Sequence, residues 1–178
     1  MADASDYRKF YHLENYLLGE VGPRFRTSGI IRPLDMLMIV IWKANHAKVK
    51  IAETLKQRAN GNFNDAVAQI AMALSATKER KERLAILMSD WGLRLSMASA
   101  ILAILHPKDF VVYDSRVCKI LGIPYRPWLP FSERLWIEYE LYREAVCKNT
   151  PPGLTLLNRY RYLWGQSLWK NAKAAMRV

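Results

Sequence analysis

Cysteine and histidine are scarce in this chain, and their scarcity excludes several chemistries. The cysteines are Cys118 and Cys147 alone, too few to hold an iron–sulfur cluster or to build a disulfide framework. The three histidines, His12, His46 and His106, are scattered, and the sequence contains no C-x-x-C or H-x-x-x-H spacing. We therefore expect neither a metal site nor a cofactor.

Long apolar runs and acidic residues are also in short supply. The longest apolar run, 36–42, is too short to span a bilayer. The first residues form no apolar signal region, and this favours the cytoplasm. Lysine and arginine number 27 against 16 aspartates and glutamates, which gives a net charge of +11. Such an excess of cations attracts a polyanion, so nucleic acid is the expected partner, with an anionic membrane surface or a ribosomal role as alternatives.

Strand-like alternation does not extend beyond a few positions, and glycine and proline gather between the helical patterns. This favours an all-α fold in a single domain over residues 1–178. Helices are expected over 7–18, from Pro33 to a break near 44–48, over 49–58, from about Asn64, and over 132–148 and 154–175. The segments 19–32 and 122–130 are expected to be loops, because they are rich in glycine or proline.

The stretch 84–122 is the most informative part of the chain. Apolar residues continue a predicted helix through 84–88, and Gly92 lies in a tight turn at 90–94. Residues 97–105 then carry an apolar stripe at helical spacing. Asp114 follows at the start of a further predicted helix, 115–121. The order is therefore helix, hairpin turn, helix and a lone carboxylate.

In order and spacing, this stretch resembles the helix-hairpin-helix superfamily of DNA glycosylases, in which a glycine-rich hairpin precedes an essential aspartate at a helix start. Gly92, Leu93 and Ala98 match the hairpin, and the run from Asp114 to Val117 matches the aspartate motif. The match covers about a quarter of the chain. The resemblance implies a two-lobed helical domain that binds double-stranded DNA, flips a base out of the duplex and cleaves its N-glycosidic bond.

Two positions depart from the family's pattern. Ser96 stands where bifunctional members carry the lysine that forms a Schiff base with the sugar, a step that needs an amine. The resemblance therefore implies a monofunctional enzyme without lyase activity. Arg94 replaces the second glycine of the hairpin, where a side chain hinders close approach of the backbone to a phosphate. This departure also puts in question the monovalent cation that family hairpins hold.

Asp114 is the expected catalytic residue. Cleavage of an N-glycosidic bond places positive charge on the sugar, and a nearby carboxylate stabilises that charge and helps water to attack. The alternative is that Asp114 only caps the helix 115–121, where a carboxylate accepts free backbone N–H groups. The two interpretations are compatible, because a helix N-terminus keeps a carboxylate ionised.

The same motif supplies the other catalytic and DNA-binding candidates. Ser96 either orients water or contacts a phosphate, and its alternative is a small residue chosen for close packing. The expected DNA-binding residues are Gly92, Leu93, Arg94, Arg116 and Lys119. For the last two of these, simple exposure to solvent is an equal alternative.

Trp42, Lys43 and Tyr113 are the residues expected around the base. The Trp42 ring lines the pocket, Lys43 reaches the DNA backbone, and Tyr113 packs under the sugar. The competing interpretation is a core tryptophan with a snorkelling lysine beside it. The last predicted helix also mixes aromatic and basic residues, among them Tyr160 and Trp164, a pattern more typical of one core face and one charged face.

Together these features predict a monomeric, monofunctional DNA glycosylase with no membrane partner. It acts in repair or, in a narrower version, in antiviral defence against phage DNA with hypermodified bases. Two other classes stay open: a non-catalytic helix-hairpin-helix module that binds DNA, and a helical RNA-binding protein. The sequence does not identify the excised base.

Overall fold

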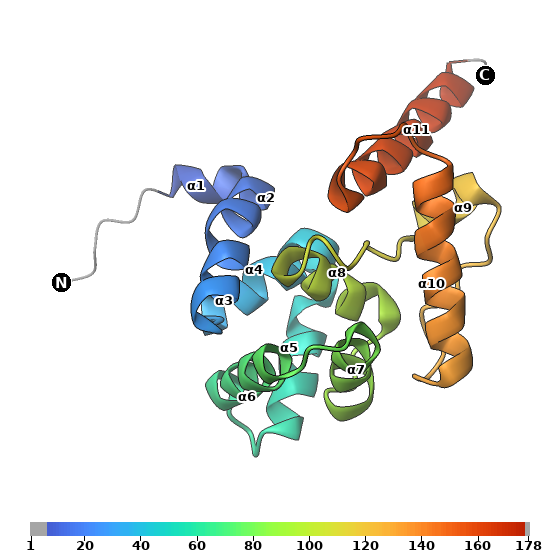
Figure 1. The fold of residues 1–178 in the computed structure, drawn as a ribbon. Helices are drawn as coiled ribbons and strands as arrows, with labels where there is room; N and C mark the ends of the chain where they lie inside the picture. The colour runs from blue at the N-terminus through green and yellow to red at the C-terminus, as the bar shows by residue number, and fades with distance from the viewer. Residues whose placement is uncertain (1–6, 177–178) are drawn as a thin grey trace.

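The computed structural model describes residues 7–176, and each regular element among them is a helix (Figure 1). In chain order they are α1 (Arg8–Tyr11), α2 (Leu13–Tyr16), η1 (Leu17–Val21), α3 (Gly22–Ser28), α4 (Pro33–Ala44), η2 (Asn45–Ala47), α5 (Lys48–Arg58), α6 (Phe63–Ala76), α7 (Arg80–Ala85), η3 (Ile86–Asp90), α8 (Leu95–Leu105), α9 (Ser115–Leu121), α10 (Glu133–Lys148) and α11 (Leu156–Ala175). The all-α prediction is confirmed for this part of the chain. No described helix is both long and apolar enough to cross a membrane.

Helix α8 lies at the centre of the fold. All of its residues except Ser96 are buried. It contacts α3, α4 and α7 together with the π-helical segments η1 and η3. Figure 1 shows it in the middle of the molecule, with α1 to α3 on one side and α10 and α11 on the other. A helix that is apolar all round is stable only when it is enclosed in this way.

The C-terminal helices form a second packed group. Helix α9 packs along α11, and α10 contacts both. Ion pairs, including the following two, connect this group to earlier helices. Arg80 of α7 donates to both carboxylate oxygens of Glu140 on α10, at 3.0 and 2.7 Å. Arg161 of α11 pairs with Glu14 of α2 at 3.0 Å. The second pair joins a helix near the start of the described chain to its last helix.

The segment 19–32 corrects a sequence prediction. The sequence predicts a loop here, but η1 runs through Val21 and α3 covers the next seven residues, so that only 29–32 is non-helical. Pro23 is the second residue of α3, where its fixed φ fits a helical backbone. Gly22 is buried against α8, and a Cβ there would lie 2.6 Å from the carbonyl oxygen of Ile104. Glycine and proline therefore begin a helix here and permit its close packing.

Most other boundaries follow the sequence prediction. The helix from Pro33 breaks after Ala44, passes through the short 3-10 segment η2 and resumes as α5. Asn62 caps α6, because its side chain accepts hydrogen bonds from the backbone N–H groups of the next turn. Ser132 caps α10 in the same way. Local capping chemistry thus sets these helix starts.

Asp35 forms a buried polar cluster that joins α2, α3 and α4. Its carboxylate is 1% exposed. Tyr16 donates to Oδ1 at 2.5 Å, and Arg24 donates to Oδ2 at 2.5 Å. The backbone N–H of Arg32 also donates to Oδ2, at 3.1 Å. A buried carboxylate is tolerated only when it is paired and hydrogen-bonded in this way.

The variant Asp35→Asn should be strongly destabilised. It leaves the Arg24 guanidinium facing an amide instead of a carboxylate, and breaking a buried pair costs about 3 kcal/mol or more. Tyr16→Phe is the matched control, since it removes one hydrogen bond to the same group and should cost less, about 2 kcal/mol. Urea unfolding at neutral pH measures both. Equal losses in the two variants would contradict an ion pair as the dominant interaction.

His106 is held neutral at the C-terminal end of α8. Its ring lies edge-on to Phe25, with 5.4 Å between the ring centroids, and its Nε2 atom is buried without a hydrogen-bond partner. Burial, helped by the positive charge of Arg83, lowers the pKa of His106 from 6.5 to about 4. The unfolded chain therefore binds a proton at this residue more readily than the folded protein does.

Acid should therefore weaken the fold through His106. The free energy of unfolding is unaffected by this residue above pH 6.5, where His106 is neutral in both the folded and the unfolded chain. It falls progressively as the pH drops toward 4, by at most about 3 kcal/mol. The measurement is the free energy of unfolding at several pH values in the wild type and in His106→Leu. The variant lacks the titrating group, so its stability should fall less over this range. Parallel curves for the two proteins would rule out the histidine as the cause.

Candidate functional site

The hairpin predicted from the sequence forms between η3 and α8. The chain turns at Gly92, whose φ of 67° lies in the left-handed region that favours glycine. Arg58 of α5 holds the approach to the turn, because its guanidinium donates to the carbonyl oxygens of Ser89 and Asp90. The hairpin is thus fixed to α5 as well as to its own two helices.

The three hairpin residues expected to bind DNA differ in their exposure. Gly92 and Arg94 are exposed, and the Arg94 side chain forms no capping hydrogen bond at the start of α8. Leu93 is buried, and its N–H donates to the carbonyl oxygen of Leu87 at 3.0 Å. Neither the side chain nor the N–H of Leu93 is therefore open to a phosphate. The physical reason is that an apolar residue in the turn closes the core beneath the hairpin.

Ser96 and Ser99 of α8 fix the residue that precedes Asp114. The Ser96 hydroxyl donates to the carbonyl oxygen of Tyr113 at 2.9 Å and lies 2.9 Å from the Tyr125 hydroxyl. The Ser99 hydroxyl accepts from the N–H of Tyr113 at 2.9 Å. Both serines therefore satisfy backbone groups of a buried, non-helical segment. Ser96 acts here as a positioning residue, and its hydroxyl does not point free into the site.

Two tyrosines of α10 hold the same segment from its other side. The Tyr139 hydroxyl donates to the carbonyl oxygen of Val111 at 2.8 Å and accepts from its N–H at 3.1 Å. The Tyr142 hydroxyl donates to the carbonyl oxygen of Val112 at 2.8 Å. Burial raises the pKa of both tyrosines, so each hydroxyl stays protonated and can donate.

Asp114 lies at the N-terminus of α9, as the sequence predicts, and both of its carboxylate oxygens are engaged. Oδ1 accepts from the backbone N–H of Arg116 at 2.9 Å. Oδ2 accepts from Nζ of Lys43 at 2.6 Å, across from the last turn of α4. The two side chains of this ion pair are 13% and 11% exposed. The carboxylate is therefore held in one orientation and is largely screened from water.

A hollow of about 300 Å³ opens on one side of Asp114. Its lining residues are Glu14, Trp42, Lys43, Asp114, Arg116, Tyr160, Arg161 and Trp164, and we call it the aromatic hollow. The two tryptophans and Tyr160 contribute aromatic rings to this lining. Burial and the negative charge of Asp114 raise the pKa of Tyr160, so its hydroxyl stays protonated. The Arg116 guanidinium lies 4.9 Å from the Trp164 ring centroid.

A second hollow, of about 410 Å³, opens on the hairpin side of Asp114. We call it the hairpin hollow, and its lining includes Lys43, Lys50, Gly92, Arg94, Ser96 and Asp114. Lys50 and Arg94 give this hollow positive charge next to the hairpin. Lys43 and Asp114 line both hollows, so this ion pair stands between an aromatic cavity and a basic surface.

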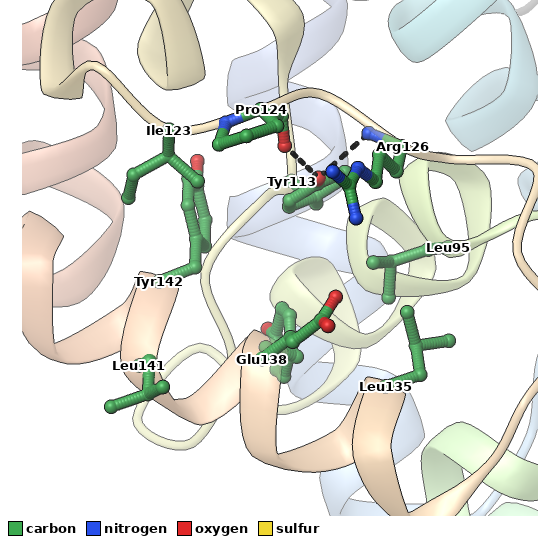
Figure 2. A pocket seen from close by; sticks show the side chains of 10 residues that line it. Leu95, Tyr113, Ile123, Pro124, Arg126, Leu135, Glu138, Leu141 and Tyr142 are labelled. Carbon is green, nitrogen blue, oxygen red and sulfur yellow. Dashed lines mark hydrogen bonds between the residues drawn. The ribbon is translucent and has the colours of Figure 1, made fainter.

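Tyr113 lines neither of the two hollows. It is buried, and its hydroxyl donates to the carbonyl oxygen of Pro124 at 3.1 Å and accepts from the N–H of Arg126 at 3.0 Å (Figure 2). Its ring lines a separate pocket of about 310 Å³ together with Leu95 and Tyr142. The expected packing of Tyr113 under a sugar is therefore not what this geometry offers. Neighbours along the chain need not share a surface, because Asp114 has an extended backbone and successive side chains of extended backbone point to opposite sides.

The remaining predicted site residues lie in different places. Trp42, Lys43 and Arg116 meet at the aromatic hollow, whereas Lys119 is exposed on α9 and lines neither hollow. Sequence reasoning assigned no role in the site to Glu14 or Arg161. A carboxylate near the start of the described chain and an arginine on the last helix carry no shared motif, so no local signal joins them. The alternation of aromatic and basic residues in the last helix was the only available hint.

No protein-family model, curated protein or solved structure significantly matches this chain. Within residues 7–176, no group of three or more histidine, cysteine, aspartate or glutamate side chains is placed to hold a metal ion. The site must therefore be interpreted from its own geometry.

Ser99→Ala should destabilise the protein and loosen the support of Asp114. The variant leaves the buried N–H of Tyr113 without an acceptor, which costs about 1–3 kcal/mol. Ser75→Ala is the control, because that serine is exposed and bonds only within its own helix, so the loss should stay below about 0.5 kcal/mol. Thermal unfolding measures both. A Ser99→Ala protein as stable as the wild type would show that the hydrogen bond is dispensable.

Proposed function

We propose that this protein is a DNA glycosylase that removes a damaged or modified base by hydrolysis and leaves an abasic site. The observation that carries the proposal is the position of Asp114, a carboxylate fixed at a helix N-terminus between an aromatic hollow and a basic hairpin surface. This arrangement suits a base inserted on one side and a DNA backbone held on the other. The net charge of +11 supports an anionic partner of this kind.

In the proposed reaction, the extruded base stacks in the aromatic hollow while its sugar lies against Asp114. The carboxylate stabilises the positive charge that develops on the sugar as the N-glycosidic bond lengthens. Water then attacks C1′, and the base leaves with a proton. Ser96 contributes no nucleophile, because its hydroxyl is bonded to the Tyr113 carbonyl oxygen. The two-lobed domain, a monomeric enzyme and a role in repair or antiviral defence remain parts of this proposal.

The hollow also bears on the choice of base. A volume of about 300 Å³ is at the lower end for small-molecule sites, so the cavity accepts a single base with its substituents. The Glu14–Arg161 pair at its lining provides both hydrogen-bond acceptors and donors. Such a pair suits a base that carries additional polar groups, which includes hypermodified phage bases.

One observation favours a second candidate function, a non-catalytic module that binds DNA through the hairpin. Both oxygens of Asp114 already have partners, one in the helix cap and one in the ion pair with Lys43. These two contacts are sufficient to account for an aspartate at this position without any catalytic role. The two candidates share the DNA-binding surface and differ in whether an abasic site is formed.

The decisive measurement is abasic-site formation on a panel of duplexes that carry oxidised, alkylated, deaminated, hydroxymethylated or glucosylated bases. Asp114→Asn keeps the shape of the side chain and can still accept the capping hydrogen bond, but it removes the charge that stabilises the transition state. We expect the wild type to act on one of these bases and the variant to lose about 100-fold or more in rate. Tight binding of DNA with no excision across the panel would establish the non-catalytic module.

A further inference from the structure

Lys43 has a position that the proposed hydrolysis does not use. Its ammonium group lies 2.6 Å from Oδ2 of Asp114, and its side chain is only 11% exposed. It also lines both the aromatic hollow and the hairpin hollow. The second lysine of the hairpin hollow, Lys50, lies on an exposed part of α5. A single screened amine therefore stands beside the carboxylate where the sugar would react.

The product of the proposed reaction is chemically suited to this amine. An abasic deoxyribose opens to an aldehyde at C1′, and a primary amine condenses with an aldehyde to form a Schiff base. Asp114, in direct contact with Lys43, is placed to take the proton that the ammonium must lose before it can attack.

We propose that Lys43 forms a Schiff base with the C1′ aldehyde of an abasic site and gives the protein a DNA lyase activity. The inference rests on the proposed function for the source of the abasic site, but the lyase step itself needs only an abasic duplex. It replaces the expectation drawn from Ser96, because the amine comes from α4 and not from the hairpin. Lys43 and Ser96 both line the hairpin hollow, although they lie far apart in the sequence.

The lyase step balances without a further reagent. Lys43 transfers a proton to Asp114, and its neutral nitrogen adds to C1′. Asp114 returns this proton to the hydroxyl group that leaves as water, which gives the protonated Schiff base and a free carboxylate. The iminium group acidifies C2′, the Asp114 carboxylate takes the C2′ proton as the C3′–O bond breaks, and the DNA strand departs as its phosphate. Water then hydrolyses the remaining imine and restores the amine.

The test uses a duplex with a preformed abasic site, so that the identity of the excised base does not matter. The protein is incubated with this duplex and sodium borohydride, which reduces a Schiff base to a stable amine. We expect a covalent protein–DNA adduct, located at Lys43 by mass spectrometry of the digested protein. Without borohydride, the strand should be cleaved at the abasic site before any treatment with alkali.

Three variants test whether Lys43 is the residue that forms the Schiff base. Lys43→Met removes the amine, and Lys43→Arg keeps a positive charge opposite Asp114 but supplies no amine that condenses with an aldehyde. Both should abolish the adduct, and thermal unfolding of Lys43→Arg checks that the fold persists. Lys56→Met removes a lysine of α5 whose side chain is 40% exposed and lines neither hollow, and it should leave the adduct in place. An adduct on another lysine, or none with the wild type, overturns the proposal.

The outcomes separate this inference from the proposed function. Abasic sites formed on the base panel, with no trapped adduct, leave a purely hydrolytic glycosylase and refute the lyase. An adduct at Lys43 on the abasic duplex, with no excision on the panel, supports a lyase that acts on abasic sites made by another enzyme. Absence of both results refutes both proposals.

Discussion

The candidate site depends on a buried stretch of backbone that is not part of any helix. Residues 110–113 are enclosed, and buried N–H and carbonyl groups are costly unless they are hydrogen-bonded. In the absence of a helix or a paired strand, side chains must provide the partners. Ser99 from α8 and Tyr139 and Tyr142 from α10 do so, which ties the central helix to the C-terminal group. These bonds also fix the position of Asp114, because it is the next residue along the chain.

The ion pair between Lys43 and Asp114 adds a second constraint on the same carboxylate. It joins the end of α4 to the start of α9 over a separation of 71 residues. Since both side chains are screened from water, the attraction between them is stronger than that of a surface pair. A carboxylate fixed in this way loses little freedom when it binds another group. Oδ2 still has a second lone pair, so the contact with Lys43 limits the directions from which another group can approach it.

The sequence was sufficient wherever the chemistry is local. Helix starts at Pro33, Asn62, Asp114 and Ser132 follow from proline geometry and from side-chain capping within the next turn, and these boundaries agree with the structure. The failure at 19–32 has a tertiary cause. From the sequence alone, Gly22 predicts an interruption of the helix, yet glycine is required there because α3 meets the backbone of α8. Local propensity gives no information about such an approach.

The site itself shows where motif reasoning stops. The spacing of the motif located Asp114, but it gave Leu93 and Tyr113 functional roles that burial does not support. Conversely, Glu14 and Arg161 meet only because the first and last described helices come together, a contact with no trace in local sequence.

Ser96 and Lys43 show that a sequence motif also cannot decide which residue supplies a reactive group. A motif assigns a reactive group by its position in the chain, and position 96 holds a hydroxyl bonded to the backbone of Tyr113. A reaction requires only that the group reach the reacting carbon, whichever helix carries it. Helix α4 brings the Lys43 amine to the carboxylate that the hairpin motif identified. The absence of lysine from one position of a motif is therefore weak grounds for excluding amine chemistry, because the fold can supply the amine from elsewhere.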